Sequence, residues 1–431
     1  MVRRRQILAG SAGLFASALA GCTAGGSADS ESTAAAESET EAATESTTTE
    51  QTTENAGQYT VEIEPNDPYT FEAVPETYGV ASGPFLDMGM ALGIHPSATT
   101  GLERAPLKFY DLLGLEFDES RLTKLASGAE SGFDKENFYA ADADVWLIAR
   151  ATLGRYVSWD ASDYEEVESQ TGPFLGTTLR FAPTAAVSNE PNPYTLYEAF
   201  EKVAGPFLGT TLRFAPTAAV SNEPNPYTLY EAFEKVATVF QRQQQFQAWQ
   251  SFHDDLMSTI EAGLPPEDER PTVAAIWRGV SPDSGQFRVA PLHRLGNNTK
   301  SYFRVGMKDA FEGRYPEGPI GYEELINVDP DYIGAVGALT SSTHEEFVDT
   351  VVEPFENNES GQRLTAVQEG NLIRSAGQYM GPIVDMFSTE AVAKMVYPDQ
   401  FGEWPGAVGD VPEDEQLFDR ERLVDIVNGN F

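Results

Sequence analysis

Apolar positions recur at three- and four-residue intervals along the middle of the chain, from Tyr227 to Ala262. This stretch contains neither Gly nor Pro, and it is rich in Glu, Gln, Ala and Leu, which lose little entropy in a helix. The phase of the apolar positions slips across the glutamine-rich run Gln241–Gln245. We therefore expect one helix that ends near Phe240 and a second that runs from about Gln243 to Ala262.

Sequence signals mark both ends of this helical segment. Thr228 can cap the first helix, and Glu231 stands at the capping-box spacing from it. Gly263, followed by two prolines, ends the second helix. Taken alone, the segment could be an ordinary pair of core helices. Strand and helix patterns on both sides of it favour a bridging segment, residues 227–263, between two lobes.

The flanking regions alternate between short apolar runs and helical patterns. We expect strands at Tyr59–Ile63, Tyr78–Ala81, Ala143–Ala149, Thr272–Trp277 and Tyr332–Ala338, and helices at Phe85–Leu92, Tyr302–Phe311, Thr389–Val396 and Arg420–Asn428. Strands that alternate with helices form mostly parallel sheets, which predicts the α/β class. The chain beyond residue 58 is long for one domain and suits an N-terminal lobe over 59–226 and a C-terminal lobe over 264–431.

A segment of 33 residues occurs twice, letter for letter, as Gly172–Ala204 and Gly205–Ala237. Solenoid repeats diverge and usually number three or more, so two identical copies indicate a recent tandem duplication or an error in the sequence record. The second copy runs directly into the bridging segment. Only one of Tyr194–Ala204 and Tyr227–Ala237 can fill the packing site suited to it, and we expect the surplus copy to loop out.

The first 22 residues read as an export signal with a lipoprotein cleavage box. Arginines precede a short apolar run, and the twin Arg4-Arg5 resembles a twin-arginine signal. The cleavage box ends at Cys22, the single cysteine of the chain, whose thiol is expected to carry the lipid. Residues 23–58 are mostly Ser, Thr, Glu, Ala and Gly and are expected to form a disordered tether. These patterns predict an extracytoplasmic protein anchored by lipid to the outer face of the cytoplasmic membrane.

Acidic residues outnumber basic ones by 67 to 28, giving a net charge of −39 that is spread along the whole chain. Such a surface repels nucleic acids and anionic membranes, so neither is expected as a partner. Distributed acidity keeps a protein hydrated in concentrated salt, which favours a halophilic source. It also means that a single Asp or Glu carries little information.

The sequence offers no enzyme signature. The four histidines have no metal-binding spacing, so we expect no metal site. Neither a nucleophile elbow nor a phosphate-binding Walker loop is present. We expect a binding protein and no catalytic residues.

One short sequence pattern recurs in the two expected lobes. In the first, Glu136 opens a short helical pattern and Asp144 follows eight residues later at the start of a strand. In the second, Glu323 and Asp331 stand in the same relation. The acids alone could be solvated helix-start residues, which the first-turn dipole favours. Their matched positions in two lobes single them out.

With these features in place, the chain resembles the solute-binding lipoproteins of ABC importers for iron–siderophores, haem and corrinoids, in their haloarchaeal form. The resemblance rests on the cleavage box, the two matched patterns, the single bridge, and three short segments, Leu92–Ile94, Leu364–Ile373 and Tyr379–Ile383. Ala143 stands where the family usually has a proline. The resemblance implies two Rossmann-like lobes joined by a single long bridging helix, with the ligand in a cleft between them.

The same resemblance implies a monomer that carries a small metal chelate to an importer permease. Glu136 and Glu323 match the acids that dock into arginine pockets of that permease, and Glu324 is the neighbour most easily confused with Glu323. No cofactor is implied; the cargo is expected to be a ferric chelate, haem or a corrinoid. A lipoprotein that senses a ligand or binds a partner, without transport, is the alternative.

Loops at the carboxyl ends of the strands face the cleft in such folds. Arginine pairs with anionic oxygens, and Trp or Tyr stacks on flat chelates, although each aromatic could equally be core. The candidate ligand-binding residues are Arg150, Arg155, Tyr156, Trp277, Arg278 and Tyr379.

Overall fold

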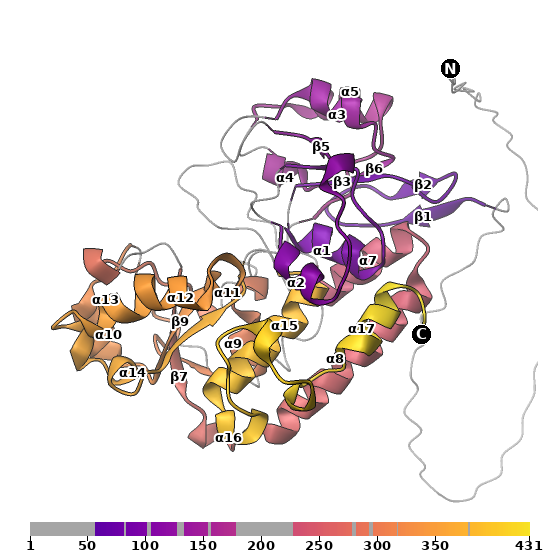
Figure 1. The fold of residues 1–431 in the computed structure, drawn as a ribbon. Helices are drawn as coiled ribbons and strands as arrows, with labels where there is room; N and C mark the ends of the chain where they lie inside the picture. The colour runs from indigo at the N-terminus through magenta and orange to yellow at the C-terminus, as the bar shows by residue number, and fades with distance from the viewer. Residues whose placement is uncertain are drawn as a thin grey trace, which may run out of the picture. The chain divides into compact units, whose positions relative to one another are not determined.

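Two four-stranded parallel sheets organise the structure (Figure 1), a computed structural model. It describes residues 57–81, 83–100, 105–126, 133–153, 157–177, 227–277, 282–292, 296–316, 318–377 and 380–431. The N-terminal sheet has the order β5-β4-β3-β6, and the C-terminal sheet β10-β9-β7-β8, with every described pair parallel. The α/β fold class predicted from the sequence is confirmed.

The strands are short and mostly buried. In the N-terminal sheet they are β3 (Tyr78–Val80), β4 (Ala98–Thr99), β5 (Thr123–Lys124) and β6 (Val145–Leu147). In the C-terminal sheet they are β7 (Thr272–Trp277), β8 (Lys308–Asp309), β9 (Tyr332–Val336) and β10 (Leu372–Ser375). The first expected strand, Tyr59–Ile63, lies outside both sheets, because β1 (Tyr59–Val61) pairs antiparallel with β2 (Tyr69–Phe71).

Helices follow most strands. Those before the bridging segment are α1 (Gly83–Ala91), α2 (Leu107–Leu112), α3 (Lys135–Ala141), α4 (Arg150–Leu153) and α5 (Ala161–Gln170). Those after it are α9 (Lys300–Arg304), α10 (Tyr322–Val328), α11 (Ala338–Ser341), α12 (His344–Phe347), α13 (Glu353–Glu356), α14 (Thr365–Gln368), α15 (Pro382–Val396), α16 (Pro398–Phe401) and α17 (Arg420–Val427).

The bridging segment forms two helices, as its apolar phase predicted. They are α7 (Leu229–Val239) and α8 (Gln243–Gly263). Thr228 and Glu231 complete the expected capping box, each side chain bonded to the other residue's amide. The chain breaks between the helices at Gln241, whose φ of 54° is left-handed. The phase slip in the sequence therefore marks a real interruption.

Helix α8 buries one face and uses polar side chains on it to cap other helices. Phe246, Trp249 and Phe252 belong to the main core. The indole of Trp249 donates to the carbonyl of Ala91 at the end of α1 (2.7 Å), and the buried Gln245 amide donates to Ile426 and Val427 carbonyls at the end of α17 (2.7 and 2.9 Å). These bonds satisfy helix-terminal carbonyls. Figure 1 shows α17 running beside α8.

Helix α15 is a second central element, and the sequence predicted only its last half. All but one of its residues are buried, because it packs against α1, α2, α7, α8, α9 and β10. A helix buried on every side has no amphipathic period. Residues 382–388, with Pro382 at the helix start, consequently gave no helical signal.

The expected helix over Tyr302–Phe311 is wrong. Helix α9 ends at Arg304, and Gly306 turns the chain with a φ of 69°. Lys308 and Asp309 then form β8, the edge strand paired with β7. The left-handed turn at glycine, which costs no steric strain there, overrides the helical spacing of the apolar residues.

Each copy of the duplicated segment contributes one end to the described structure. Phe174, from the first copy, forms a parallel bridge with Trp146 at the edge of the N-terminal sheet. Residues 227–237, from the second copy, form the start of the bridging segment and most of α7. Tyr194–Ala204, the alternative occupant of the α7 site, lies outside the described residues.

Candidate functional site

Helix α3 exposes Glu136 because it buries Phe138. Asp134 caps the helix, its carboxylate accepting a bond from the Glu136 amide (3.2 Å). Phe138 is fully buried, with its ring 4.7 Å from the ring of Trp146. Two helical positions correspond to a rotation of about 200°, so the Glu136 side chain points away from that core.

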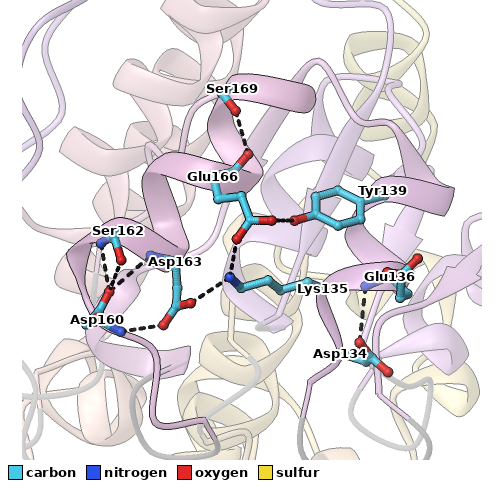
Figure 2. Close-up of polar contacts among 9 residues, drawn as sticks. All are labelled: Asp134, Lys135, Glu136, Tyr139, Asp160, Ser162, Asp163, Glu166 and Ser169. Atoms are coloured by element: carbon cyan, nitrogen blue, oxygen red, sulfur yellow. Dashed lines mark hydrogen bonds and ion pairs between the residues drawn. The ribbon is translucent and has the colours of Figure 1, made fainter.

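Lys135 ties α3 to α5 through a polar network (Figure 2). Its ammonium donates to Asp163 and Glu166 at 2.6 Å each, and the Tyr139 hydroxyl donates to Glu166 (3.0 Å). These bonds raise the pKa of Lys135 and lower the pKa values of both carboxyl groups. Figure 2 shows the Glu136 carboxylate outside this network.

Helix α10 presents Glu323 by the same geometry. Leu325, two positions later, is fully buried, whereas Glu323 is exposed. Glu324 bends back to accept a bond from the Gly321 amide at the helix start (2.8 Å). Among the described residues, no hydrogen bond or ion pair engages the Glu323 carboxylate. Of the two adjacent acids, Glu323 is thus the one available to a partner.

The two helices end alike. Each is followed by an aspartate in the left-handed conformation, Asp142 (φ 43°) and Asp329 (φ 36°). Two residues later, Asp144 and Asp331 accept bonds from the amide and hydroxyl of a threonine at the start of the neighbouring strand, Thr77 just before β3 and Thr272 in β7. The sequence echo is therefore a true structural repeat, with the helix, turn and strand start in equivalent positions of both sheets.

Two of the candidate ligand-binding residues lie at strand ends, as expected. Arg150 begins α4 directly after β6, but its guanidinium pairs with Glu168 (2.6 Å) and lies over the ring of Tyr164. Trp277 is the last residue of β7 and is half-buried. Arg150 can contact a ligand only by sharing or leaving Glu168.

The remaining candidates lie outside the described residues. They are Arg155, Tyr156, Arg278, Tyr379 and the lipidation residue Cys22. Their assignments stay predictions.

A buried carboxylate that sequence reasoning missed joins α1 to α15. Asp87 is fully buried, and its carboxylate accepts bonds from the Ile383 and Val384 amides (2.9 and 3.2 Å) at the start of α15. A Cβ added at Gly381 would lie only 2.4 Å from the Asp87 Cβ, so the two helices meet at this glycine. Burial raises the Asp87 pKa to about 7, partly opposed by the bonds from the helix amides.

Arg304 continues this buried polar region toward α8. Its guanidinium pairs with the fully buried Asp385 and donates to Nε2 of His253 (2.6 Å). An arginine can only donate, so His253 carries its proton on Nδ1, which faces Asp254 at 3.3 Å. Burial, with the nearby cations of Arg304 and Lys300, lowers the His253 pKa to about 2, and the ring stays neutral.

Lys300 completes the cluster from the first turn of α9. It is half-buried, and its ammonium lies 5.2 Å from the centre of the Tyr230 ring. Burial, followed by Arg304, lowers its pKa to about 7. One signal in the sequence could have found this region: Asp87 and Asp385 are single acids inside otherwise apolar helical runs.

Neither a metal-binding cluster nor a membrane-spanning helix occurs among the described residues. They contain no group of three or more His, Cys, Asp or Glu that could hold a metal ion. Among them, no helix is both long enough and apolar enough to cross a membrane.

The family comparison fits this architecture. Residues 210–379 match a family model described as periplasmic binding protein. The matched range includes the bridging helices, α10 with Glu323, and both β9 and β10. No curated protein sequence matches the chain.

Solved structures share the fold at low sequence identity. The petrobactin-binding protein YclQ of Bacillus subtilis matches with a TM-score of 0.52 and 14% identity, over 79% of this chain and 99% of that one. A periplasmic solute-binding protein of Mycobacterium smegmatis has a TM-score of 0.52 and 12% identity, over 79% and 98%. The iron-uptake system-binding protein FeuA of Bacillus subtilis has a TM-score of 0.50 and 13% identity, over 78% and 100%. At such identities the likeness concerns the fold alone.

Proposed function

We propose that this protein is a periplasmic binding protein: a lipid-anchored, extracytoplasmic receptor that captures an iron–siderophore-type chelate and delivers it to the permease of an ABC importer. Haem and corrinoids are the alternative cargoes. In this proposal, residues 59–226 and 264–431 are the two ligand-binding lobes, joined by the bridging segment 227–263. The protein works as a monomer, tethered through Cys22 by residues 23–58 after export by the twin-arginine route.

The observation that carries this proposal is the matched pair of acidic helices. Helices α3 and α10 each expose one glutamate at the second position, opposite a buried apolar residue. A permease dimer has two equivalent halves, so two equivalent acids suit two equivalent arginine pockets. Guanidinium–carboxylate pairing is bidentate and directional, which favours fixed carboxylates over mobile ones.

Two kinds of observation support an iron chelate as the cargo: what proteins of the same fold bind, and the chemistry of the candidate ligand-binding residues. YclQ binds petrobactin and FeuA belongs to an iron-uptake system, and both share this fold. Arginines suit the anionic oxygens of a ferric chelate, and the half-buried Trp277 offers a ring that a flat ligand can cover. The acidic surface supports operation at high salt.

Tryptophan fluorescence tests the cargo directly. The mature protein, in molar salt, is titrated with ferric catecholate and hydroxamate siderophores, haem and cobalamin. Saturable quenching by one of these is expected, and Trp277→Phe should remove part of that signal. Trp249→Phe is the matched control, because Trp249 is fully buried in the core. No response from any compound, in protein shown to be folded, would count against the proposal.

A further inference from the structure

The residue just before each exposed glutamate anchors its helix. Lys135 is the first residue of α3 and precedes Glu136; Tyr322 is the first residue of α10 and precedes Glu323. The two positions are equivalent in the structural repeat, yet one is a cation and the other an aromatic ring. Each is fastened to a different neighbouring element.

The Lys135 anchor is electrostatic. Its ammonium reaches two carboxylates of α5, Asp163 and Glu166, and it is the more buried partner in both pairs, with 22% side-chain exposure against 30% and 53%. Asp163 is itself fixed, because it accepts a bond from the Asp160 amide (2.8 Å) in the capping box of α5. Figure 2 shows the Lys135 side chain reaching from α3 to Asp163 and Glu166 on α5.

The Tyr322 anchor depends on packing. Its hydroxyl donates to the Pro282 carbonyl (3.0 Å). Its ring lies edge-on to Phe287 and Phe355, with centroids 5.0 and 5.8 Å away. The side chain is 9% exposed, so it fixes the start of α10 within the C-terminal core.

Helices as short as these need such anchors. Each has seven residues, and isolated helices of fewer than about 12 residues are marginal in water. Phe138 or Leu325 holds only one side of the helix. A second fixed point at the first residue prevents rotation of the helix about its own axis. It therefore fixes the direction in which the neighbouring glutamate points.

We propose that Lys135 and Tyr322 are positioning residues for docking: they hold α3 and α10 at the rotation that presents Glu136 and Glu323 to the permease. This inference rests on the docking function proposed above. A simple charge effect predicts the opposite sign for Lys135, because a cation beside Glu136 repels the arginine of a permease pocket. Its removal would then strengthen docking.

The test combines uptake with amide hydrogen exchange. The full-length protein replaces the native copy in its own cells, and uptake of radioactive ferric siderophore is measured. Exchange of the α3 and α10 amides is followed on the purified protein. The variants are Lys135→Met, Lys135→Arg and Tyr322→Phe. Lys124→Met and Tyr332→Phe are matched controls, since Lys124 is exposed and Tyr332 likewise donates to a carbonyl.

The positioning role predicts a specific pattern. Lys135→Met should lower uptake by roughly three- to tenfold and speed exchange in α3 alone, while Lys135→Arg, which can still pair with both carboxylates, restores both. Tyr322→Phe should lower uptake by about threefold and speed exchange in α10 alone. The controls should leave both measurements unchanged.

Two results would overturn the inference in different ways. If Glu136→Ala and Glu323→Ala abolish uptake while Lys135→Met leaves it unchanged or raises it, docking stands and positioning fails. If the two alanine variants take up iron normally, docking by these acids fails, and the positioning role fails with it.

Discussion

Asp331 and Thr272 join the starts of two neighbouring strands, β9 and β7, through three hydrogen bonds. The carboxylate accepts from the Thr272 amide and hydroxyl at 2.7 Å each, and the same hydroxyl accepts from the Asp331 amide at 3.0 Å. Asp144 and Thr77 form the same three bonds in the N-terminal sheet: the carboxylate accepts from the Thr77 amide (3.1 Å) and hydroxyl (3.0 Å), and the hydroxyl accepts from the Asp144 amide (3.0 Å). We call each of these three-bond pairs a clasp. Both clasps lie directly behind a helix that presents an exposed glutamate, so they link the surface helices to the sheets.

Removing either clasp should destabilise the protein. Asp331→Ala or Asp144→Ala leaves two donors of the threonine without their acceptor, and we expect the free energy of unfolding to fall by about 1–2 kcal/mol in each case. The corresponding Asn variants keep an acceptor oxygen and should lose less than about 1 kcal/mol. Urea denaturation measures both. Equal losses for Ala and Asn would contradict the hydrogen-bonding role.

The left-handed aspartates of the two helices predict opposite responses to glycine. Asp142 is exposed, and within the described part of the chain its carboxylate makes no hydrogen bond or ion pair, so Asp142→Gly should relieve strain and stabilise the protein by about 0.5–1 kcal/mol. Asp329 also bonds the Thr365 amide and hydroxyl (3.0 and 2.9 Å). Asp329→Gly loses those bonds and should be neutral or destabilising. Thermal unfolding of the pair is the measurement, and stabilisation by both would refute the role given to Asp329.

Sequence periodicity predicted those elements of the fold that have one solvent-exposed face and one buried face. The break between α7 and α8, strand β7 and the acidic sequence patterns of α3 and α10 all follow from local pattern. The early half of α15 did not, because a helix buried all round carries no period. Strand β8 could not be predicted from the pattern either. It has only two residues, and in the sequence they look like a continuation of the helix before the left-handed Gly306.

The site shows the same division. The exposed positions of Glu136 and Glu323 could be predicted, because each stands in the first turn of a short helix before a strand, while their docking role stays a prediction. The role of Lys135 could not, because its partners Asp163 and Glu166 lie on a helix 28 and 31 residues further along. The contact of Asp87 with Ile383 joins residues 296 positions apart, which no local pattern encodes.

Asp87 should make stability fall as pH rises toward neutrality. Its pKa is raised from 3.8 to about 7 in the folded protein by burial. Between these values the folded state holds a proton that the unfolded state has released, so stability declines from about pH 4 to 7 and then levels off. Asp87→Asn keeps an oxygen for the two helix amides and removes the titration. It should be more stable than the parent protein by on the order of 2 kcal/mol at pH 8, and similar at pH 5.

Lys300 should make stability rise with pH in the range above that of Asp87. Its pKa is lowered from 10.5 to about 7, mainly by burial. Between these values the unfolded state holds the proton, so stability rises from about pH 7 to 10.5. The two groups together predict a stability minimum near pH 7. Lys300→Met should flatten the alkaline limb only.

Urea denaturation of the parent and both variants across pH 5–10 separates the two effects. Lys300 is half-buried, so its limb should be the shallower one. An Asp87→Asn variant whose stability still falls between pH 5 and 7 would exclude Asp87 as the source of the acid limb.

The tandem duplication makes one deletion uniquely informative. Removing residues 172–204 or 205–237 gives the same protein, because the copies are identical. The shortened protein keeps one phenylalanine that can form the bridge to Trp146, as Phe174 does. It also keeps one that can fill the core under α7, as Phe233 does. The connection between these two sites, residues 178–226, shortens by 33 residues, which favours the folded state by about 1 kcal/mol through loop-closure entropy.

Point variants in the two copies show which copy fills each site. Phe233 is fully buried, so Phe233→Ala should lower the free energy of unfolding by about 3–4 kcal/mol, whereas Phe200→Ala, its counterpart in the first copy, should change it by less than about 1 kcal/mol. Phe174→Ala and Phe207→Ala should differ in the same direction, with the first-copy residue now the sensitive one, because Phe174 makes the bridge to Trp146. Urea denaturation of the four variants and the deletion protein measures all of this. Equal losses for Phe200→Ala and Phe233→Ala would mean that both copies pack, and the deletion would then destabilise the protein instead of sparing it.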